Sequence, residues 1–208
     1  MKMIQLTNKT IFAIAPHVDD VELGAGGTIY QLGKTNRVFY IGLSLPPLVN
    51  NDTLLSEFHN SAAILGIKPD HVILKSYDPR NLFDVRMEIL QFFYDLNKQY
   101  KPDLVFIPNS KDIHQSHEVV FAEGRRAFKY SSILGYELPW NSFDFKMDLF
   151  IELSKESVDA KVKAINAYET QKSRMFFSND IVGDLARVRG KQIGKEYAEC
   201  FEVIRMIL

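Results

Sequence analysis

Cysteine is almost absent from this chain of 208 residues, which contains one, Cys200. An intrachain disulfide needs two cysteines, so a disulfide framework is excluded, and so is a Cys-rich metal site. Cys200 stands in the apolar context YAECF. That context favours a packed thiol over a catalytic nucleophile.

The chain also lacks an excess of charge of either sign. It has 25 Lys and Arg residues against 26 Asp and Glu residues, a formal net charge of -1. A domain-wide basic surface is therefore absent, and we expect no nucleic-acid partner. No apolar run reaches the roughly 18 residues of a membrane span, and the first ten residues hold no apolar stretch typical of a signal peptide. We therefore expect a cytoplasmic protein without a membrane span.

Short apolar runs rich in β-branched and aromatic residues recur instead, at 11–15, 37–43, 71–75 and 103–108. They predict strands that are buried on both faces. Segments with helical spacing separate them, and further strands are expected at 132–136, 149–153 and 201–207, with helices at 53–65, 85–100, 155–170 and 180–198. This alternation predicts an α/β fold with a mostly parallel sheet covered by helices on both faces. We expect a single domain over residues 1–208.

Two polar clusters directly follow two of these strands. His17, Asp19 and Asp20 come after the first strand, and His114 and His117 come after the 103–108 strand. In a doubly wound sheet, the first and fourth strands commonly flank the point where the strand order reverses, and ligands bind there. We therefore expect the two clusters to face each other across one crevice.

The residue types in the clusters match a catalytic metal site. His17, Asp20 and His117 offer the three protein ligands that a catalytic zinc takes, with a further position open for water. Asp19 is then left beside the metal, where it suits a general base acting on water. His114 is left to act on the substrate.

Other catalytic motifs are absent or incomplete. The chain has no P-loop, no G-x-S-x-G elbow and no H-E-x-x-H. Gly24 and Gly26 could open a dinucleotide-binding loop, but Ile29 stands where the third glycine belongs. A nucleotide-dependent Rossmann enzyme and a non-catalytic metal- or sugar-binding α/β module are the alternative interpretations.

The stretch APHVDDVELGAGGT (15–28), together with the later Asp-x-His-x-x-His of residues 112–117, resembles the signature of the PIG-L/LmbE-like zinc deacetylases. These enzymes hydrolyse N-acetylglucosaminyl conjugates and related acylated amines. PDLVFIP (102–108), AYETQ (167–171) and RGKQIGKEYAECF (189–201) extend the resemblance from about residue 10 to the C-terminus. The segment 130–165 is the least similar.

The resemblance implies a Rossmann-like fold and a metal-dependent hydrolase that removes an acetyl or other acyl group from the amine of an amino sugar or its conjugate. It implies that His17, Asp20 and His117 bind Zn²⁺ or another divalent transition metal. It implies that Asp19 is the general base and that His114 stabilises the oxyanion or protonates the leaving amine. A small-molecule acylated amino sugar is the expected partner, and trimeric or hexameric homo-oligomers are implied.

The chain departs from the family pattern at several positions. Val18 stands where many members have Pro, and the acid that follows the Asp pair is shifted from position 21 to Glu22. Ser116 replaces an Asp that members commonly carry just before the last His. A hydroxyl cannot stabilise an imidazolium by charge, so we expect a lower pKa or looser placement for His114.

Substrate recognition has fewer sequence signals. Arg80 follows the third predicted strand, at the same end of the sheet as the two clusters, and is our candidate for binding sugar hydroxyls or a phosphate. The segment 44–52 lies at the same edge and is interpreted as a lid loop.

Overall fold

The sheet at the centre of the molecule is seven-stranded, with the order β3-β2-β1-β4-β5-β7-β6. The computed structural model describes residues 6–44, 51–174 and 179–207. The strands are β1 (Thr10–His17), β2 (Arg37–Ser44), β3 (Val72–Tyr77), β4 (Leu104–Pro108), β5 (Ser132–Tyr136), β6 (Leu149–Leu153) and β7 (Tyr197–Arg205). Strands β1 to β5 pair in parallel, whereas β7 runs antiparallel to both β5 and β6. The predicted α/β fold with a mostly parallel sheet is confirmed.

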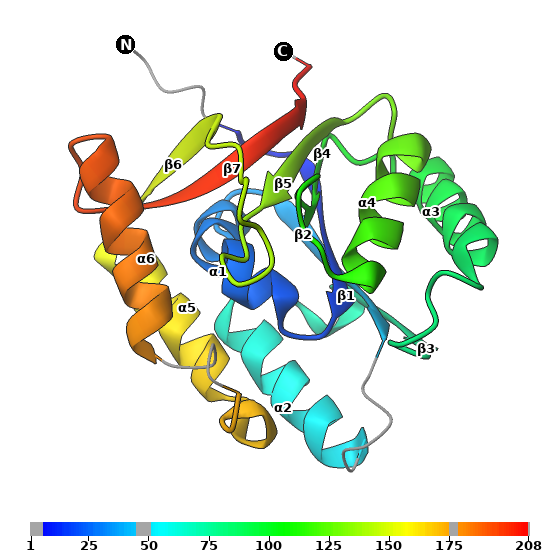
Figure 1. Cartoon of the computed structure of the whole chain (residues 1–208), viewed down its shortest axis with the longest axis horizontal. Coiled ribbons are helices and arrows are strands. Elements are labelled where there is room, and N and C mark those ends of the chain that lie inside the picture. Colours follow the sequence, from blue (N-terminus) through cyan, green and yellow to red (C-terminus); the bar gives the residue numbers. More distant parts are fainter. Residues whose placement is uncertain (1–5, 45–50, 175–178, 208) are drawn as a thin grey trace.

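Helices cover both faces of this sheet (Figure 1). One face carries α1 (Asp20–Gly33), α2 (Asn51–Ile64), α5 (Lys155–Asn166) and α6 (Asn179–Gln192), and the other carries α3 (Arg86–Tyr100) and α4 (Gln115–Ala127). Short 3-10 turns lie at η1 (Pro69–His71) and η2 (Glu169–Gln171). None of the helices in the described ranges is long and apolar enough to cross a membrane.

Strand β1 explains why the apolar runs are unbroken. Ile11, Ala13 and Ala15 belong to the core beneath α1, whereas Phe12 and Ile14 belong to the core beneath α3 and α4. Because both faces of the strand are covered, residues of both parities are apolar.

The C-terminal third departs from the predicted elements. The predicted helix 180–198 is wrong beyond Gln192, because Gly194 adopts a φ of +70° and β7 begins at Tyr197. The predicted helix 155–170 ends at Asn166 and continues as the turn η2. Helix α4 was not among the predicted elements. The predicted lid loop at 44–52 falls largely outside the described residues.

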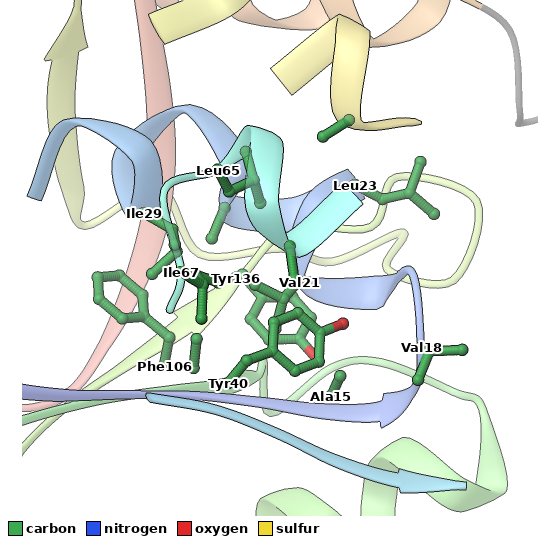
Figure 2. Close-up of a cluster of buried hydrophobic side chains, with 14 of the residues drawn as sticks. Ala15, Val18, Val21, Leu23, Ile29, Tyr40, Leu65, Ile67, Phe106 and Tyr136 are labelled. Atoms are coloured by element: carbon green, nitrogen blue, oxygen red, sulfur yellow. The ribbon is translucent and has the colours of Figure 1, made fainter. Parts of the chain in front are cut away.

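The glycines of the first motif serve close packing. A Cβ atom on Gly24 would lie 2.5 Å from Tyr136 Cδ2, and one on Gly27 would lie 2.6 Å from Leu153 Cδ1. Figure 2 shows the rings of Tyr136 and Tyr40 in the space between the sheet and the helices above it. The glycines therefore let α1 approach these side chains, a role different from cradling the phosphates of a dinucleotide.

Cys200 lies in the core, with 2% of its surface exposed. Burial, followed by the charge of Glu137, raises the pKa of its thiol to about 12. The thiol is therefore protonated at neutral pH, as expected of a packed cysteine.

A buried ion pair joins α5 to β7. Lys161 Nζ lies 2.6 Å from Glu199 Oε1, and the two side chains are 2% and 5% exposed. The Glu199 carboxylate also accepts the backbone N–H groups of Gly27 at 3.0 Å and Thr28 at 2.7 Å. One carboxylate thereby connects α1, α5 and β7.

We predict that Lys161→Met lowers the free energy of unfolding by about 3–5 kcal/mol, because it leaves the Glu199 carboxylate buried without its cation. Urea unfolding monitored by circular dichroism measures this loss. Lys163→Met, at an exposed position of the same helix, is the matched control and should change stability by less than about 0.5 kcal/mol. Equal losses in the two variants would show that the ion pair contributes nothing specific.

Candidate metal and catalytic site

The site lies where the strand order reverses. Strand β1 pairs with β2 on one side and with β4 on the other, so the loops that follow β1 and β4 leave the same edge of the sheet side by side. The two polar clusters flank these loops: His17 ends β1 and Asp20 begins α1, while His114 caps α4 and His117 lies in its first turn. The structure brings the clusters into contact: His117 Nε2 lies 3.2 Å from His17 Nδ1.

Three donor atoms form a nearly equilateral triangle. Asp20 Oδ2 lies 3.1 Å from His17 Nδ1 and 3.2 Å from His117 Nε2. With the 3.2 Å between the two imidazole nitrogens, all three sides agree closely. A tetrahedral ion with bonds of roughly 2.0–2.1 Å separates its ligand atoms by roughly 3.3 Å. We call these three atoms the donor triangle, and their spacing fits one such ion.

His114 lies beside the triangle. A second group of possible donors consists of one nitrogen from each of His17, His114 and His117. These nitrogens lie within 4.8 Å of one another, so they are more widely spaced than the atoms of the donor triangle. The Nδ1 atom of His114 accepts the backbone N–H of Ser116 at 3.3 Å. The neutral ring therefore carries its hydrogen on Nε2 and can donate it.

The pKa of His114 is lowered to about 4, first by burial and then by the neighbouring His117 and His17. The lower pKa expected for His114 is confirmed in direction. Its cause is burial of the ring together with the two neighbouring imidazoles. The backbone N–H of Ser116 also holds the ring in place, so His114 is fixed and neutral at neutral pH.

Asp112 is a further residue of the candidate site, and the sequence motifs assigned it no role. Its Oδ2 lies 2.7 Å from His117 Nδ1, and its Oδ1 accepts the backbone N–H of His114 at 2.9 Å. A carboxylate on the far nitrogen fixes the tautomer and orientation of a metal-binding imidazole. The sequence signal was the Asp at the head of Asp-x-His-x-x-His.

Charges within the cluster shift its pKa values strongly. Burial opposes the charged form of His117, but Asp20 and Asp112 outweigh it and raise the pKa of the imidazole to about 10. Burial likewise opposes the charged form of Asp20, but His117 and His17 outweigh it and lower the pKa of that carboxyl. The cluster therefore stabilises a positive charge between two carboxylates.

Asp19 has a strained backbone, with a φ of 124°. Its N–H donates to Tyr40 Oη at 3.4 Å, and that hydroxyl donates to Glu22 Oε2 at 2.7 Å. Burial, and then the charge of Asp20, raise the pKa of the Asp19 carboxyl. Arg174 lies on its other side, with Nη1 3.5 Å from Asp19 Oδ2. Strain of this kind clusters at functional sites.

The turn of residues 78–81, which contains Arg80, contacts the first turn of α4 next to the site. Arg80 is exposed, and its N–H donates to Asp78 Oδ1 at 2.9 Å. Ser116 Oγ donates to the carbonyl oxygen of Pro79 at 2.6 Å, so the turn is joined to the first turn of α4. The Ser116 hydroxyl therefore points at the turn, and the contact of Ser116 with His114 comes from its backbone.

We predict that Asp19→Gly stabilises the chelator-treated protein by about 1–3 kcal/mol, because glycine tolerates a φ of 124° and a buried carboxylate is removed. Asp19→Ala removes the same carboxylate but keeps a Cβ, so it should gain less. Urea unfolding of the two variants and wild type provides the comparison. Equal stability of the Ala and Gly variants would mean that the backbone at this position is unstrained.

Comparison with known proteins gives relatives over most of the chain, although no protein-family model matches it. The chain is 26% identical over 173 residues to the uncharacterized deacetylase YaiS of Escherichia coli K12, covering 78% of this chain and 91% of YaiS. It is 24% identical over 227 residues to the diacetylchitobiose deacetylase of Thermococcus kodakarensis, covering 92% of this chain and 81% of that enzyme.

Solved structures share the fold. The conserved protein TT1542 from Thermus thermophilus superposes with a TM-score of 0.79 at 21% identity, covering 96% of both chains. GalB, the 4-carboxy-2-hydroxymuconate hydratase of Pseudomonas putida KT2440, superposes with a TM-score of 0.75 at 17% identity, covering 96% of this chain and 98% of GalB. The fold thus accompanies more than one chemistry, and the sequence relatives are deacetylases. The resemblance to the PIG-L/LmbE-like deacetylases that the two motifs indicated is thereby confirmed.

Proposed function

We propose that this chain is a zinc-dependent hydrolase that removes the acetyl group from the amine of an N-acetylated amino sugar or its conjugate. The observation that carries the proposal is the donor triangle of His17, Asp20 and His117, preceded in the chain by the buried Asp19. Two imidazoles and one carboxylate at this spacing suit zinc, and other divalent transition metals accept the same donors. The similarity to a diacetylchitobiose deacetylase supports the substrate class.

The metal ligands are held in place by the rest of the chain. Asp112 directs Nε2 of His117 into the triangle, and the backbone N–H of His17 donates to Asp20 Oδ2 at 2.8 Å. A zinc ion held there supplies a Lewis acid that makes a water more acidic and polarises an acyl oxygen.

Asp19 is the general base in this proposal. It adjoins a metal ligand in the sequence, its carboxylate lies outside the triangle, and its side chain is buried against Arg174. The carboxylate takes a proton from water as the water oxygen attacks the amide carbon. The same proton then passes to the amine nitrogen as the C–N bond breaks, which yields acetate and a primary amine.

His114 stabilises the oxyanion that forms on the acyl oxygen. Its Nδ1 is occupied by the Ser116 N–H, so Nε2–H is the group that it offers to the site. A neutral donor held in position before the reaction lowers the barrier without transferring its own proton. Arg80, in the turn that Ser116 contacts through Pro79, binds the hydroxyl groups of the sugar.

Zinc binding to the chelator-stripped protein tests the metal site by calorimetry. We expect about one Zn²⁺ per chain in wild type and no comparable binding in His117→Ala, because a catalytic site provides only three protein ligands. His59→Ala is the matched control, since His59 is an exposed histidine on α2 outside the cluster, and it should bind zinc like wild type. Tight one-to-one binding retained by His117→Ala would refute the donor triangle.

Acetate release from N-acetylglucosamine and N,N'-diacetylchitobiose tests the catalytic roles. Asp19→Asn should retain zinc and lower kcat by about 10²–10⁴-fold, the usual contribution of a general base. His114→Ala should also retain zinc and lower kcat by about 10²–10³-fold, the cost of one oxyanion donor. Turnover at the wild-type rate in Asp19→Asn would contradict the base assignment, and the His59→Ala variant again serves as the control.

A further inference from the structure

We propose that Ser116 is a positioning residue for substrate binding: its hydroxyl fixes the Asp78–Arg80 turn and so places the Arg80 guanidinium at the rim of the site. The inference rests on the proposed function, and it names the contact that sets substrate affinity there. Ser116 thus has a positioning role at a site where members of the similar deacetylase family commonly carry Asp.

The hydrogen bond from Ser116 to Pro79 is short, and its donor is fully buried. Ser116 has 0% of its surface exposed, and its Oγ donates to the carbonyl oxygen of Pro79 at 2.6 Å. A carbonyl accepts hydrogen bonds only, so its partner must be a donor. Serine supplies that donor, whereas an ionised Asp at position 116 would place a second acceptor against the carbonyl. The serine therefore suits this turn and the aspartate does not.

The turn transmits this contact to Arg80. Asp78 Oδ1 accepts the N–H of Arg80 at 2.9 Å, and the Asp78 carbonyl accepts the N–H of Asn81 at 3.0 Å. Pro79 between them has a restricted φ. A hydrogen bond to the Pro79 carbonyl consequently fixes the backbone from which the Arg80 side chain projects.

The turn belongs to the connection between β3 and α3, residues 78–85. A second contact anchors the far end of this connection to α4. Arg86 Nε donates to Glu123 Oε1 at 2.9 Å, and Glu123 is fully buried. Leu82, between the two anchors, is 1% exposed. Loss of the Ser116 hydroxyl therefore frees only the first part of the connection, the part with Arg80, while Arg86 still holds the rest.

The side chain and the backbone of Ser116 act on different partners. The hydroxyl contacts Pro79, and the backbone N–H contacts His114 Nδ1. Substitution of the side chain leaves the N–H in place, so it should alter substrate binding and spare the chemical step. This separation makes the role of the hydroxyl measurable.

Steady-state kinetics of acetate release from N,N'-diacetylchitobiose test the proposal. Ser116→Ala and Arg80→Ala should each raise KM about tenfold and change kcat by less than about twofold. Because Ser116 acts through Arg80, the double variant should have the KM of Arg80→Ala alone. Ser116→Thr keeps the hydroxyl and should restore the wild-type KM.

Ser157→Ala is the matched control. Ser157 is also fully buried in the first turn of a helix, and its hydroxyl donates to Gln31 Oε1 at 3.2 Å, away from the site. It should leave KM unchanged. Two outcomes would show that Ser116 does not act through Arg80. One is a lower kcat at unchanged KM in Ser116→Ala. The other is a KM in the double variant that rises by the product of the two single increases.

Hydrogen exchange separates this inference from the proposed function, because it needs no turnover. In Ser116→Ala, the amides of Arg80 and Asn81 should exchange faster than in wild type, with those of residues 114–117 unchanged. Unchanged exchange at the turn overturns the inference whatever the activity. If the wild-type protein hydrolyses no N-acetylated amino sugar while the turn still loosens in the variant, the proposed function fails and the positioning contact stands.

Discussion

The chain of contacts from Asp112 through His117 to Asp20 is the interaction on which the rest of the site depends. His117 is 2% exposed and lies between the two carboxylates, at 2.7 Å from Asp112 and 3.2 Å from Asp20. Burying these groups is costly unless each is paired, and here each charge faces an opposite one. The contacts also join the first turn of α4 to the start of α1, so the two halves of the site are held by the groups that would bind the ion.

The position of α1 controls whether this network forms. Asp20 is the first residue of α1, and the helix lies close to the sheet because Gly24 and Gly27 leave room for Tyr136 and Leu153. The Glu199 carboxylate fixes the middle of the same helix through two backbone N–H groups. Packing far from the donor triangle thereby places one of its three atoms.

In the proposed reaction, Asp19 and His114 take different tasks because their surroundings differ. Asp19 is buried beside Asp20 on a strained backbone, which suits a proton acceptor. His114 has a lowered pKa and a committed Nδ1, which suits a neutral donor. The strain at Asp19 lowers stability at the position where the proposed reaction needs a base, a common exchange of stability for function. Since a hydratase shares this fold, such local placements decide the chemistry.

By itself, the sequence determined the strands that are apolar on both faces, the mostly parallel sheet, and the meeting of His17 with His117 at the reversal of strand order. Those features follow from residue type and spacing along the chain. Only the tertiary structure decided that Asp112 orients His117, that Ser116 contacts Pro79 and that His114 is neutral. The Ser116 contact spans 37 residues, and burial of the imidazole depends on which elements surround it. Such interactions are set by the relative placement of separate elements, which local sequence patterns do not encode.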